Sequence, residues 1–237
     1  MTRAGLLAVV LSVSSVGLIV GCPQNPRGAR EIPEGARVIK LSLHGLDCAE
    51  CGAELAADLL EVDGVYDTHF SKKRVVMTVF VKDGVSPDAL IAVVKRAGFT
   101  AEVGDMGGSW LPQPAFSANE NVDYPIKDGA DLQDLSALAY PGKVTVIDLF
   151  ANWCKPCREV DSHMKTLLPS HPDLAYRKLD IVDWDSPLAV HQLAGVKELP
   201  YVLVYGKDRR RIEAISGLDL KRLDASIAAA EKAPATP

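Results

Sequence analysis

The sequence contains few cysteines, few aromatic residues and no excess of positive charge. Cysteine accounts for 5 of the 237 residues, and aromatic residues for 6%. This is too little cysteine for a scaffold of this size that is held together mainly by disulfides. Lys and Arg number 26 against 31 Asp and Glu, so the net charge is −5. Without a global positive field, nucleic acid is not expected as a partner.

A long hydrophobic run is also missing. The most apolar stretch, residues 6–20, is interrupted by Ser12, Ser14 and Gly17, and it is shorter than the roughly 20 residues that span a bilayer. It follows Arg3 near the N-terminus, which is typical of an export signal. A retained helical anchor is the alternative interpretation.

The composition that is present is that of a folded protein, with 48% apolar and 24% charged residues. A chain of 237 residues is longer than a typical single domain of roughly 100–200 residues, which favours two small domains. The placement of the cysteines is more informative than their number. One is single, Cys22, and the others form two Cys-x-x-Cys pairs, Cys48/Cys51 and Cys154/Cys157.

The single cysteine ends the apolar stretch. The residues around it, Leu18-Ile19-Val20-Gly21-Cys22, resemble the lipobox of bacterial lipoproteins. The resemblance implies that residues 1–21 are a signal peptide and that Cys22 is lipidated. The protein is then expected in the bacterial cell envelope, lipid-anchored and facing the periplasm, with residues 22–35 as a tether rich in Pro, Gly and charge. In the alternative interpretation, Cys22 merely ends a cleaved signal.

Residues 36–104 carry the pattern of a small α/β domain. Ile39, Leu41 and Leu43 alternate with polar residues, which predicts a half-buried strand. A loop with the first cysteine pair follows, and apolar residues then recur at helical spacing. Later patterns predict a hairpin, a second helix and a last strand, at residues 65–70, 75–81, 86–98 and 99–103. The order βαββαβ is that of a ferredoxin-like sandwich.

The cysteine pair in this domain has the chemistry of a soft-metal site, because two thiolates at the start of a helix can converge on one ion. The segment resembles the heavy-metal-associated domain of metallochaperones and metal-pumping ATPases through its motif, Gly45-Leu46-Asp47-Cys48-Ala49-Glu50-Cys51, in which Leu46 replaces the family's usual Met. The resemblance implies a heavy-metal ion at Cys48 and Cys51. This ion is either Cu(I) or, with an added oxygen from Asp47, a divalent soft ion.

Other interpretations of these residues stay open. In an oxidising compartment the pair could be a structural or redox disulfide. His44 is near enough in sequence to coordinate a metal, but it is interpreted as an ordinary loop histidine. A zinc site made of both cysteine pairs is not expected, since zinc knuckles usually place their pairs about 15–20 residues apart.

Residues 105–118 contain Gly and Pro clusters and are predicted to link the first domain to a second one at residues 119–237. Within this linker, Trp110 and Phe116 are expected to pack on the second domain.

The second domain places its cysteine pair between a strand and a helix. The apolar run Val144–Phe150 is typical of a fully buried strand. It leads directly into Cys154 and Cys157 and then into a helical stretch, which is a redox arrangement rather than a zinc knuckle. The other predicted elements are helices at residues 131–138, 187–194 and 219–230 and strands at residues 174–181, 201–205 and 210–215.

This segment resembles thioredoxin over about half of the chain. The residues that carry the resemblance are Asp148, Trp153-Cys154-Lys155-Pro156-Cys157, Lys178, Leu199-Pro200 and Gly217. The resemblance implies a thioredoxin fold, a cis-proline at Pro200 and no organic cofactor. The fold class predicted for the whole chain is therefore α/β, with a ferredoxin-like domain followed by a thioredoxin fold.

Thiol chemistry then assigns roles to the two cysteines. Cys154, at the exposed N-terminus of a helix and beside Lys155, is expected to have a lowered thiol pKa and to attack a substrate disulfide. Cys157, one turn further along and more buried, is expected to resolve the mixed disulfide.

The thioredoxin resemblance supplies roles for the neighbouring residues. It implies that Asp148 helps to deprotonate the resolving thiol, with Lys178 as its partner. Pro200 is expected to present backbone to a substrate and to keep metal ions away from the dithiol. Trp153 is expected either to shield the sulfurs or to serve packing alone.

The predicted function is that of an anchored thiol–disulfide oxidoreductase, acting as a reductase, that keeps metal-binding thiols of its own first domain or of a client reduced. Its expected partners are a disulfide-containing protein, a thiol electron donor and, through the lipid anchor, a membrane. The alternatives are a metal-binding chaperone or scavenger with an accessory redox domain, and an inert interaction module.

Overall fold

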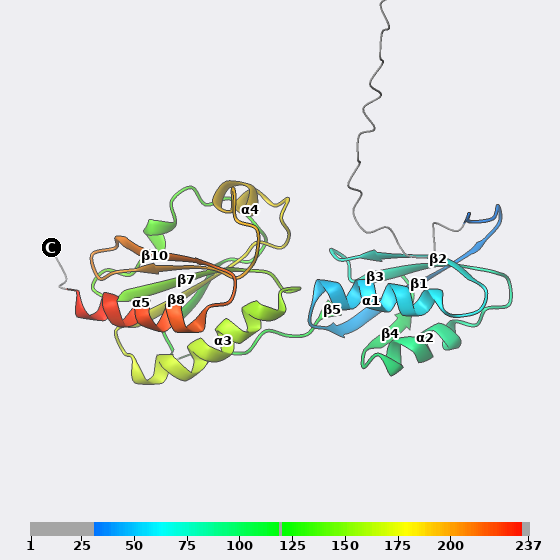
Figure 1. Ribbon diagram of the computed structural model, residues 1–237, viewed down its shortest axis with the longest axis horizontal. Coiled ribbons are helices and arrows are strands. Elements are labelled where there is room, and N and C mark those ends of the chain that lie inside the picture. The colour runs from blue at the N-terminus through cyan, green and yellow to red at the C-terminus, as the bar shows by residue number, and fades with distance from the viewer. Residues whose placement is uncertain (1–30, 119, 234–237) are drawn as a thin grey trace, which may run out of the picture. The chain divides into compact units, whose positions relative to one another are not determined.

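The computed structural model describes residues 31–118 and 120–233 (Figure 1). The predicted signal peptide, the lipidation site Cys22 and most of the tether at residues 22–35 lie outside the described residues. Within the described ranges, no helix combines the length and apolar character needed to cross a membrane.

The first folded domain has the predicted order βαββαβ. Antiparallel pairing gives the sheet order β2-β3-β1-β4, and a short additional strand, β5, pairs with β1 in parallel. Its elements are β1 (Arg37–Leu46), α1 (Ala49–Leu60), β2 (Val65–Ser71), β3 (Val76–Val81), α2 (Pro87–Arg96), β4 (Thr100–Val103) and β5 (Ser109–Trp110). The ferredoxin-like prediction is confirmed.

Strand β5 belongs to the segment that the sequence predicted to be a linker. It pairs with His44 and Leu46 at the end of β1, directly before the cysteine loop. Trp110 therefore packs in the core of the first domain, with its ring edge-on to Phe70 at a centroid distance of 6.2 Å. The expectation that Trp110 packs on the second domain is wrong. Phe116 does pack there, against Tyr176.

The second folded domain is a five-stranded sheet in the order β10-β9-β7-β8-β6. Its strands are β6 (Val122–Ile126), β7 (Val144–Phe150), β8 (Leu174–Asp180), β9 (Tyr201–Tyr205) and β10 (Arg211–Ser216). Its helices are η1 (Leu135–Leu138), α3 (Lys155–Leu167), η2 (Leu168–Ser170), α4 (Pro187–Gln192) and α5 (Leu220–Lys232), of which η1 and η2 are 3-10 turns.

The sequence pattern predicts a short helix at residues 131–138 and no strand at residues 122–126, whereas the structure has the 3-10 turn η1 and the strand β6 there. Strand β6 contains Pro125, which weakens a strand pattern because proline cannot donate a backbone hydrogen bond. Its pairing with β8 is long-range and parallel. The consequence is that β8 is an interior strand, and every residue from Leu174 to Asp180 is buried.

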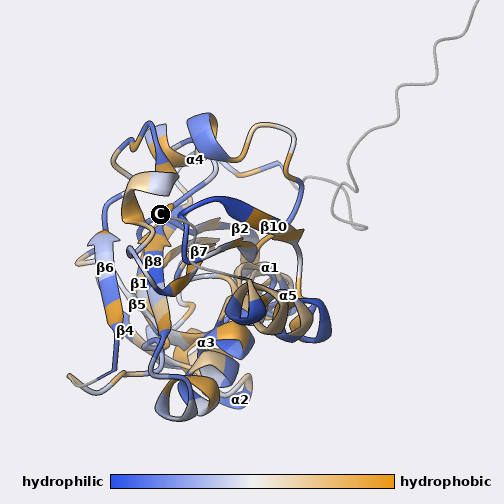
Figure 2. Ribbon diagram, turned by 90° about the vertical axis from the view of Figure 1, so that its left-hand side faces the viewer, coloured by the Kyte–Doolittle hydropathy of each residue, from blue (hydrophilic) through white to orange (hydrophobic). Residues whose placement is uncertain are grey.

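Two apolar layers hold this sheet. On one face, Val144 and Val146 of β7 pack with α3 and α5. On the other face, Ile147 and Leu149 pack with α4, so α4 lies on the opposite side of the sheet from α3 and α5 (Figure 1). Helix α3 carries hydrophobic and hydrophilic residues on different sides, as its colouring shows (Figure 2). Its N-terminus follows the end of β7, which positions the second cysteine pair.

Candidate redox and metal-binding sites

The second cysteine pair is built into the first turn of α3. Cys154 is the N-cap of the helix, and its Sγ accepts a hydrogen bond from the backbone N–H of Cys157 at 3.2 Å. The two sulfurs form a disulfide with a bond length of 2.04 Å. An N-cap position exposes a sulfur to the unpaired N–H groups of the helix, which favours its anionic form once the disulfide is reduced.

The exposure of Cys154 differs from the expectation. Cys154 is 4% exposed and Cys157 is fully buried, at 0%. The predicted order of burial is correct, but the prediction of an exposed Cys154 is wrong. Cys154 packs in the apolar cluster that includes Phe150 and Leu179, and the residues on either side of it contact the first domain.

A buried polar cluster lies on the α3 face of the sheet. Asp148, Asp161 and Lys178 are all 0% exposed. Lys178 donates to Asp161, while the hydroxyl of Tyr176 lies 2.9 Å from Asp148 Oδ2 and 2.9 Å from Asp161 Oδ1. Asp148 and Lys178 are register partners across β7 and β8. The direct ion pair of Lys178 nevertheless forms with Asp161, so the expected partnership with Asp148 reduces to a longer-range attraction.

Burial and the neighbouring charges determine the pKa of Asp148 in this cluster. Burial raises the pKa of Asp148 to about 7, and the charge of Asp161 adds to the rise, while Lys178 and the Tyr176 hydroxyl oppose it. A tyrosine hydroxyl has one proton to donate. The Tyr176 hydroxyl is within donating distance of both Asp148 Oδ2 and Asp161 Oδ1, so it donates to one of the two carboxyl groups at a time. The other oxygen of Asp148, Oδ1, is buried without a hydrogen-bond partner.

Asp161 and Tyr176 were missed by the sequence analysis, although both leave a signal. Asp161 follows Cys157 by four positions and falls on the same side of α3 as the buried residues Val160 and Met164. A carboxylate on the apolar face of a helix indicates a buried partner. Tyr176 precedes Lys178 by two positions on β8 and therefore shares its face of the sheet.

The remaining predicted residues have structural partners. The peptide bond between Leu199 and Pro200 is cis. The carbonyl of Pro200 accepts from the N–H of Gly217 at 2.9 Å, so part of the backbone expected to face a substrate is already paired. The indole N–H of Trp153 donates to the carbonyl of Val182 at 2.7 Å, and its ring packs against the core.

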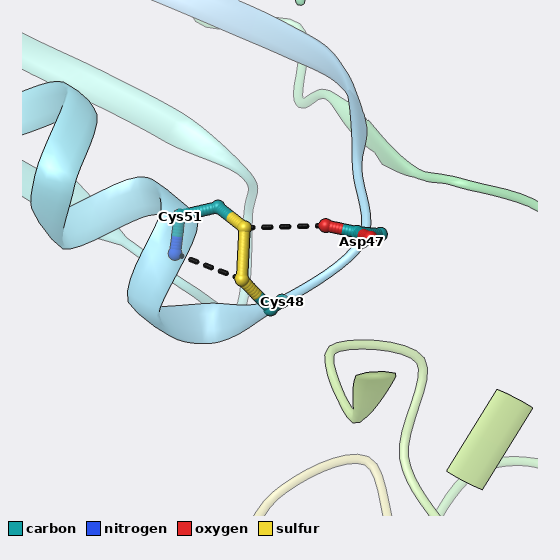
Figure 3. Close-up of side chains that lie close together, drawn as sticks. All are labelled: Asp47, Cys48 and Cys51. Carbon is teal, nitrogen blue, oxygen red and sulfur yellow. Dashed lines mark hydrogen bonds between the residues drawn. A yellow bond between two sulfur atoms is a disulfide. The ribbon is translucent and has the colours of Figure 1, made fainter. Parts of the chain in front are cut away.

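The first cysteine pair repeats the same construction. Cys48 is the N-cap of α1, and its Sγ accepts from the N–H of Cys51 at 3.1 Å. The sulfurs form a disulfide of 2.01 Å. Asp47 Oδ1 lies 3.2 Å from Cys51 Sγ (Figure 3). A disulfide sulfur has no proton to donate, so this contact becomes a hydrogen bond once Cys51 is a thiol.

The donor set of this site fits a soft metal ion. One ligand atom from each of Asp47, Cys48 and Cys51 lies within 4.8 Å of the others, and all three residues are partly exposed. The sulfurs must first be reduced, because metal ligation requires thiolates. His44 is not part of this group; its ring nitrogen pairs with Ser109 Oγ at 2.9 Å. Leu46, which replaces the methionine of the motif, is fully buried.

Known proteins are similar to parts of this chain. Residues 134–229 match the family model described as thioredoxin. Thioredoxin-1 of Schizosaccharomyces pombe is 32% identical over 104 residues, covering 44% of this chain and 97% of that protein. Thioredoxin-2 of Saccharomyces cerevisiae is 33% identical over 93 residues, covering 38% of this chain and 86% of that protein. The solved structure of the yeast copper transporter domain CCC2A is 25% identical, with a TM-score of 0.28, and covers 29% of this chain and 94% of that chain.

The alignment with the first of these relatives spans nearly its whole length, and the residues matched by the family model include the Cys154/Cys157 pair. The chain therefore belongs to the thioredoxin family of thiol–disulfide oxidoreductases.

Proposed function

We propose that this protein is a membrane-anchored envelope thiol–disulfide reductase coupled to heavy-metal binding. Its second domain keeps metal-binding thiols reduced, in its own first domain or in a metalloprotein client. The observation that carries the proposal is the occurrence, in one chain, of two disulfides at helix N-termini, the first of which has the carboxylate of Asp47 within ligand distance of its sulfurs.

The redox cycle follows from thiol–disulfide exchange. The thiolate of Cys154 attacks a client disulfide, forming a mixed disulfide and releasing one client thiolate. The thiolate of Cys157 then attacks Cys154 Sγ, which restores the bond between these two cysteines and releases the second client thiolate. Two electrons pass to the client, and an external thiol donor replaces them.

Asp148 supplies the proton acceptor in this cycle. A carboxyl group whose pKa is raised to about 7 can hold a proton or release it near neutral pH. Its unpartnered Oδ1 is free to accept the proton of Cys157 as that thiol becomes a nucleophile.

The first domain binds the metal as cargo. When reduced, Cys48 and Cys51 present two thiolates, which suit Cu(I), and Asp47 adds an oxygen that suits a divalent soft ion such as Zn(II) or Cd(II). An ion that arrives at the oxidised pair finds no thiolate, so metal uptake by this site depends on a reductant.

Anchoring is proposed from the sequence around Cys22. Replacement by serine is expected to abolish labelling with a palmitate analogue and to release the protein from membranes. Unchanged labelling and membrane association in the variant would refute the lipid anchor.

The reductase activity is tested with insulin as the disulfide substrate. The full chain with a thiol donor is expected to reduce insulin, and Cys154→Ser is expected to abolish the reaction. The direction of transfer is tested by equilibrating the Cys154/Cys157 pair with glutathione. Thioredoxin-like reductants lie near −270 mV and strong oxidants near −120 mV, and a potential at the oxidising end would overturn the reductase assignment.

A metal scavenger with an accessory redox domain is the second candidate, favoured by the Asp47, Cys48 and Cys51 cluster. Metal tolerance of cells that carry Cys48→Ser or Cys154→Ser separates the two functions. Loss of tolerance in both supports a coupled reductase, whereas loss in Cys48→Ser alone supports the scavenger.

A further inference from the structure

The residues that flank the first cysteine of each pair contact one another. Asp47 Oδ2 lies 3.2 Å from Lys155 Nζ. The backbone N–H of Ala49 donates to the carbonyl of Trp153 at 3.2 Å. The residue before one cysteine thus meets the residue after the other, so segments 47–49 and 153–155 face each other in antiparallel register.

This register places Cys48 opposite Cys154. Ala49 and Trp153, which the backbone hydrogen bond joins, are the chain neighbours of Cys48 and Cys154. The Cα atom of each cysteine therefore lies about 3.8 Å from the Cα atom of a residue in the contact. Their sulfurs are also the two N-cap sulfurs of α1 and α3. The sulfurs that begin the two helices are therefore brought to the same contact.

Further polar contacts join the same two parts of the chain. Lys72 Nζ, from the turn between β2 and β3, lies 2.7 Å from Asp183 Oδ1 and 4.1 Å from the centre of the Trp153 ring. Arg158 of α3 donates to the carbonyl of Pro112 at 2.9 Å. The Lys72 pair is three-quarters buried on each side, with 28% and 25% exposure, so it contributes more than an open surface pair.

The contact lies on both sides of the buried Cys154. A helix N-cap at the end of a strand is normally open to a substrate, but Cys154 is 4% exposed. The 47–49 segment lies against Trp153 and Lys155, the residues on either side of Cys154. Cys48, in the middle of this segment, is therefore held next to the element that carries Cys154.

From this arrangement we infer that the Cys48–Cys51 disulfide is an intramolecular substrate of Cys154. The inference rests on the proposed reductase function and names its substrate. The Cys154 thiolate attacks Cys48 Sγ, the Cys48–Cys51 bond breaks, and Cys51 leaves as a thiolate. Cys157 then attacks Cys154 Sγ, and Cys48 leaves as the second thiolate. Two electrons pass from the second domain to the first, and an external thiol donor supplies them.

The inference is tested by trapping the intermediate in the full chain, with Cys22→Ser in every variant. Cys51→Ser/Cys157→Ser leaves Cys48 and Cys154, which are expected to form a disulfide under mild oxidation with diamide. The product is read as a monomer on non-reducing gels, and peptide mass spectrometry identifies the bond. Its rate is expected to stay constant over a tenfold dilution of the protein, because the reaction is intramolecular. A rate proportional to protein concentration, or dimers alone, overturns the inference.

Two matched variants test the register. Cys48→Ser/Cys157→Ser leaves Cys51 and Cys154, and Cys51→Ser/Cys154→Ser leaves Cys48 and Cys157. Each is expected to crosslink at least tenfold more slowly than the first variant. Equal rates in all three variants would mean that the domains collide at random, and would overturn the assignment of Cys48 as the attacked sulfur.

A charge exchange tests the contact itself in the trapping background. Lys155→Glu places a negative charge against Asp47 and is expected to slow the crosslink, while the added Asp47→Lys is expected to restore it. Lack of restoration would show that Lys155 acts on its neighbouring thiol and not through Asp47, which would overturn the proposed docking contact.

Insulin reduction by the Cys22→Ser protein, measured in parallel, separates the two failures. Insulin reduction without a Cys48–Cys154 crosslink refutes the intramolecular substrate and leaves the reductase in place. Absence of insulin reduction together with a crosslink refutes the general reductase and leaves an exchange confined to the chain.

Discussion

Tyr176 Oη lies 2.9 Å from Asp148 Oδ2, which makes this hydroxyl the hydrogen-bond partner of the carboxyl group proposed to take the proton of Cys157. The hydrogen bond lowers the pKa of Asp148 against the larger effect of burial. We therefore expect Tyr176→Phe to raise this pKa further. The pH dependence of insulin reduction is then expected to shift to higher pH, and stability to fall by about 1–3 kcal/mol, because buried oxygens lose their partner.

The matched control for this prediction is Tyr124→Phe. Tyr124 lies on β6 in the same domain, with its ring centre 5.3 Å from Lys178 Nζ. The Tyr124→Phe variant loses a hydroxyl but keeps Tyr176, the hydrogen-bond partner of Asp148. Its pH profile is therefore expected to follow that of the unmodified protein. Identical profiles for Tyr176→Phe and the unmodified protein would contradict the role given to this hydroxyl.

Asp148→Asn is expected to stabilise the protein at high pH and to change little at low pH. The pKa of Asp148 is raised from 3.8 to about 7 in the folded state. Between these values the folded state binds more protons than the unfolded state, so stability falls as the pH rises through this window. Removing the carboxylate removes that loss. The expected gain at pH 8 is about 1–3 kcal/mol.

Urea unfolding at pH 4 and pH 8 measures this difference. Trp110 is replaced by Phe in both proteins, so that fluorescence reports Trp153 and Trp184 of the second domain. Asp161→Asn serves as the contrast, because it deprives the buried Lys178 of its direct partner and is expected to destabilise at pH 8. If Asp148→Asn raised the free energy of unfolding equally at both pH values, the titration of Asp148 would not be the cause of the gain.

Asp47→Asn is expected to weaken the binding of divalent ions more than the binding of Cu(I) in the reduced protein. The variant removes a hard oxygen from the Asp47, Cys48 and Cys51 group but leaves both thiolates. Affinity for Zn(II) or Cd(II) is expected to fall at least about tenfold, which is about 1.4 kcal/mol. Anaerobic competition titrations with chromophoric chelators measure both ions. Glu50→Gln, an exposed acidic residue between the two cysteines, is the control. Equal losses for Cu(I) and Zn(II) would remove Asp47 from the ligand set.

Gly52→Ala is expected to destabilise the first domain. Gly52 is buried in α1 directly after Cys51, and a Cβ there would stand 2.1 Å from Phe70 Cε1. Alanine improves helix propensity by roughly 1 kcal/mol, but a contact this short displaces the Phe70 ring, and overpacking costs about 1–3 kcal/mol.

Urea unfolding followed by the fluorescence of Trp110, with Trp153 and Trp184 replaced by Phe, measures the loss. Ala53→Ser on the exposed side of α1 is the control. The pair Gly52→Ala/Phe70→Leu is expected to recover part of the stability, since the smaller side chain makes room. An unchanged midpoint for Gly52→Ala would show that the helix can move away from β2 at little cost.

The sequence predicted those parts of the structure that depend on local patterns. The alternation around Leu41 and the strand at Val144–Phe150 need no knowledge of distant residues, and the helix starts at Cys48 and Cys154 follow from spacing. Strand β6 was missed because its partner β8 is some fifty positions away and Pro125 interrupts its pattern. Asp161 was missed as the partner of Lys178 because the choice between two carboxylates depends on packing across α3 and β8.

The burial of Cys154 could not be predicted for a similar reason. A helix N-terminus is exposed in isolation, and the 47–49 segment that contacts its neighbours comes from another domain more than one hundred positions earlier. Charge pattern alone does not select Asp47 for Lys155 among many acidic residues. Long-range contacts between folded domains leave no periodicity in the sequence.

Because the two cysteine pairs have the same construction, the spacing of their sulfurs gives a soft cation no preference for one pair over the other. Discrimination between cargo and catalyst then rests on the adjoining charge, which is negative at Asp47 and positive at Lys155, and these two side chains are paired with each other in the closed contact. An ion that draws the carboxylate toward itself would weaken its hold on the ammonium group. Loading the first dithiol would thereby weaken the contact between segments 47–49 and 153–155.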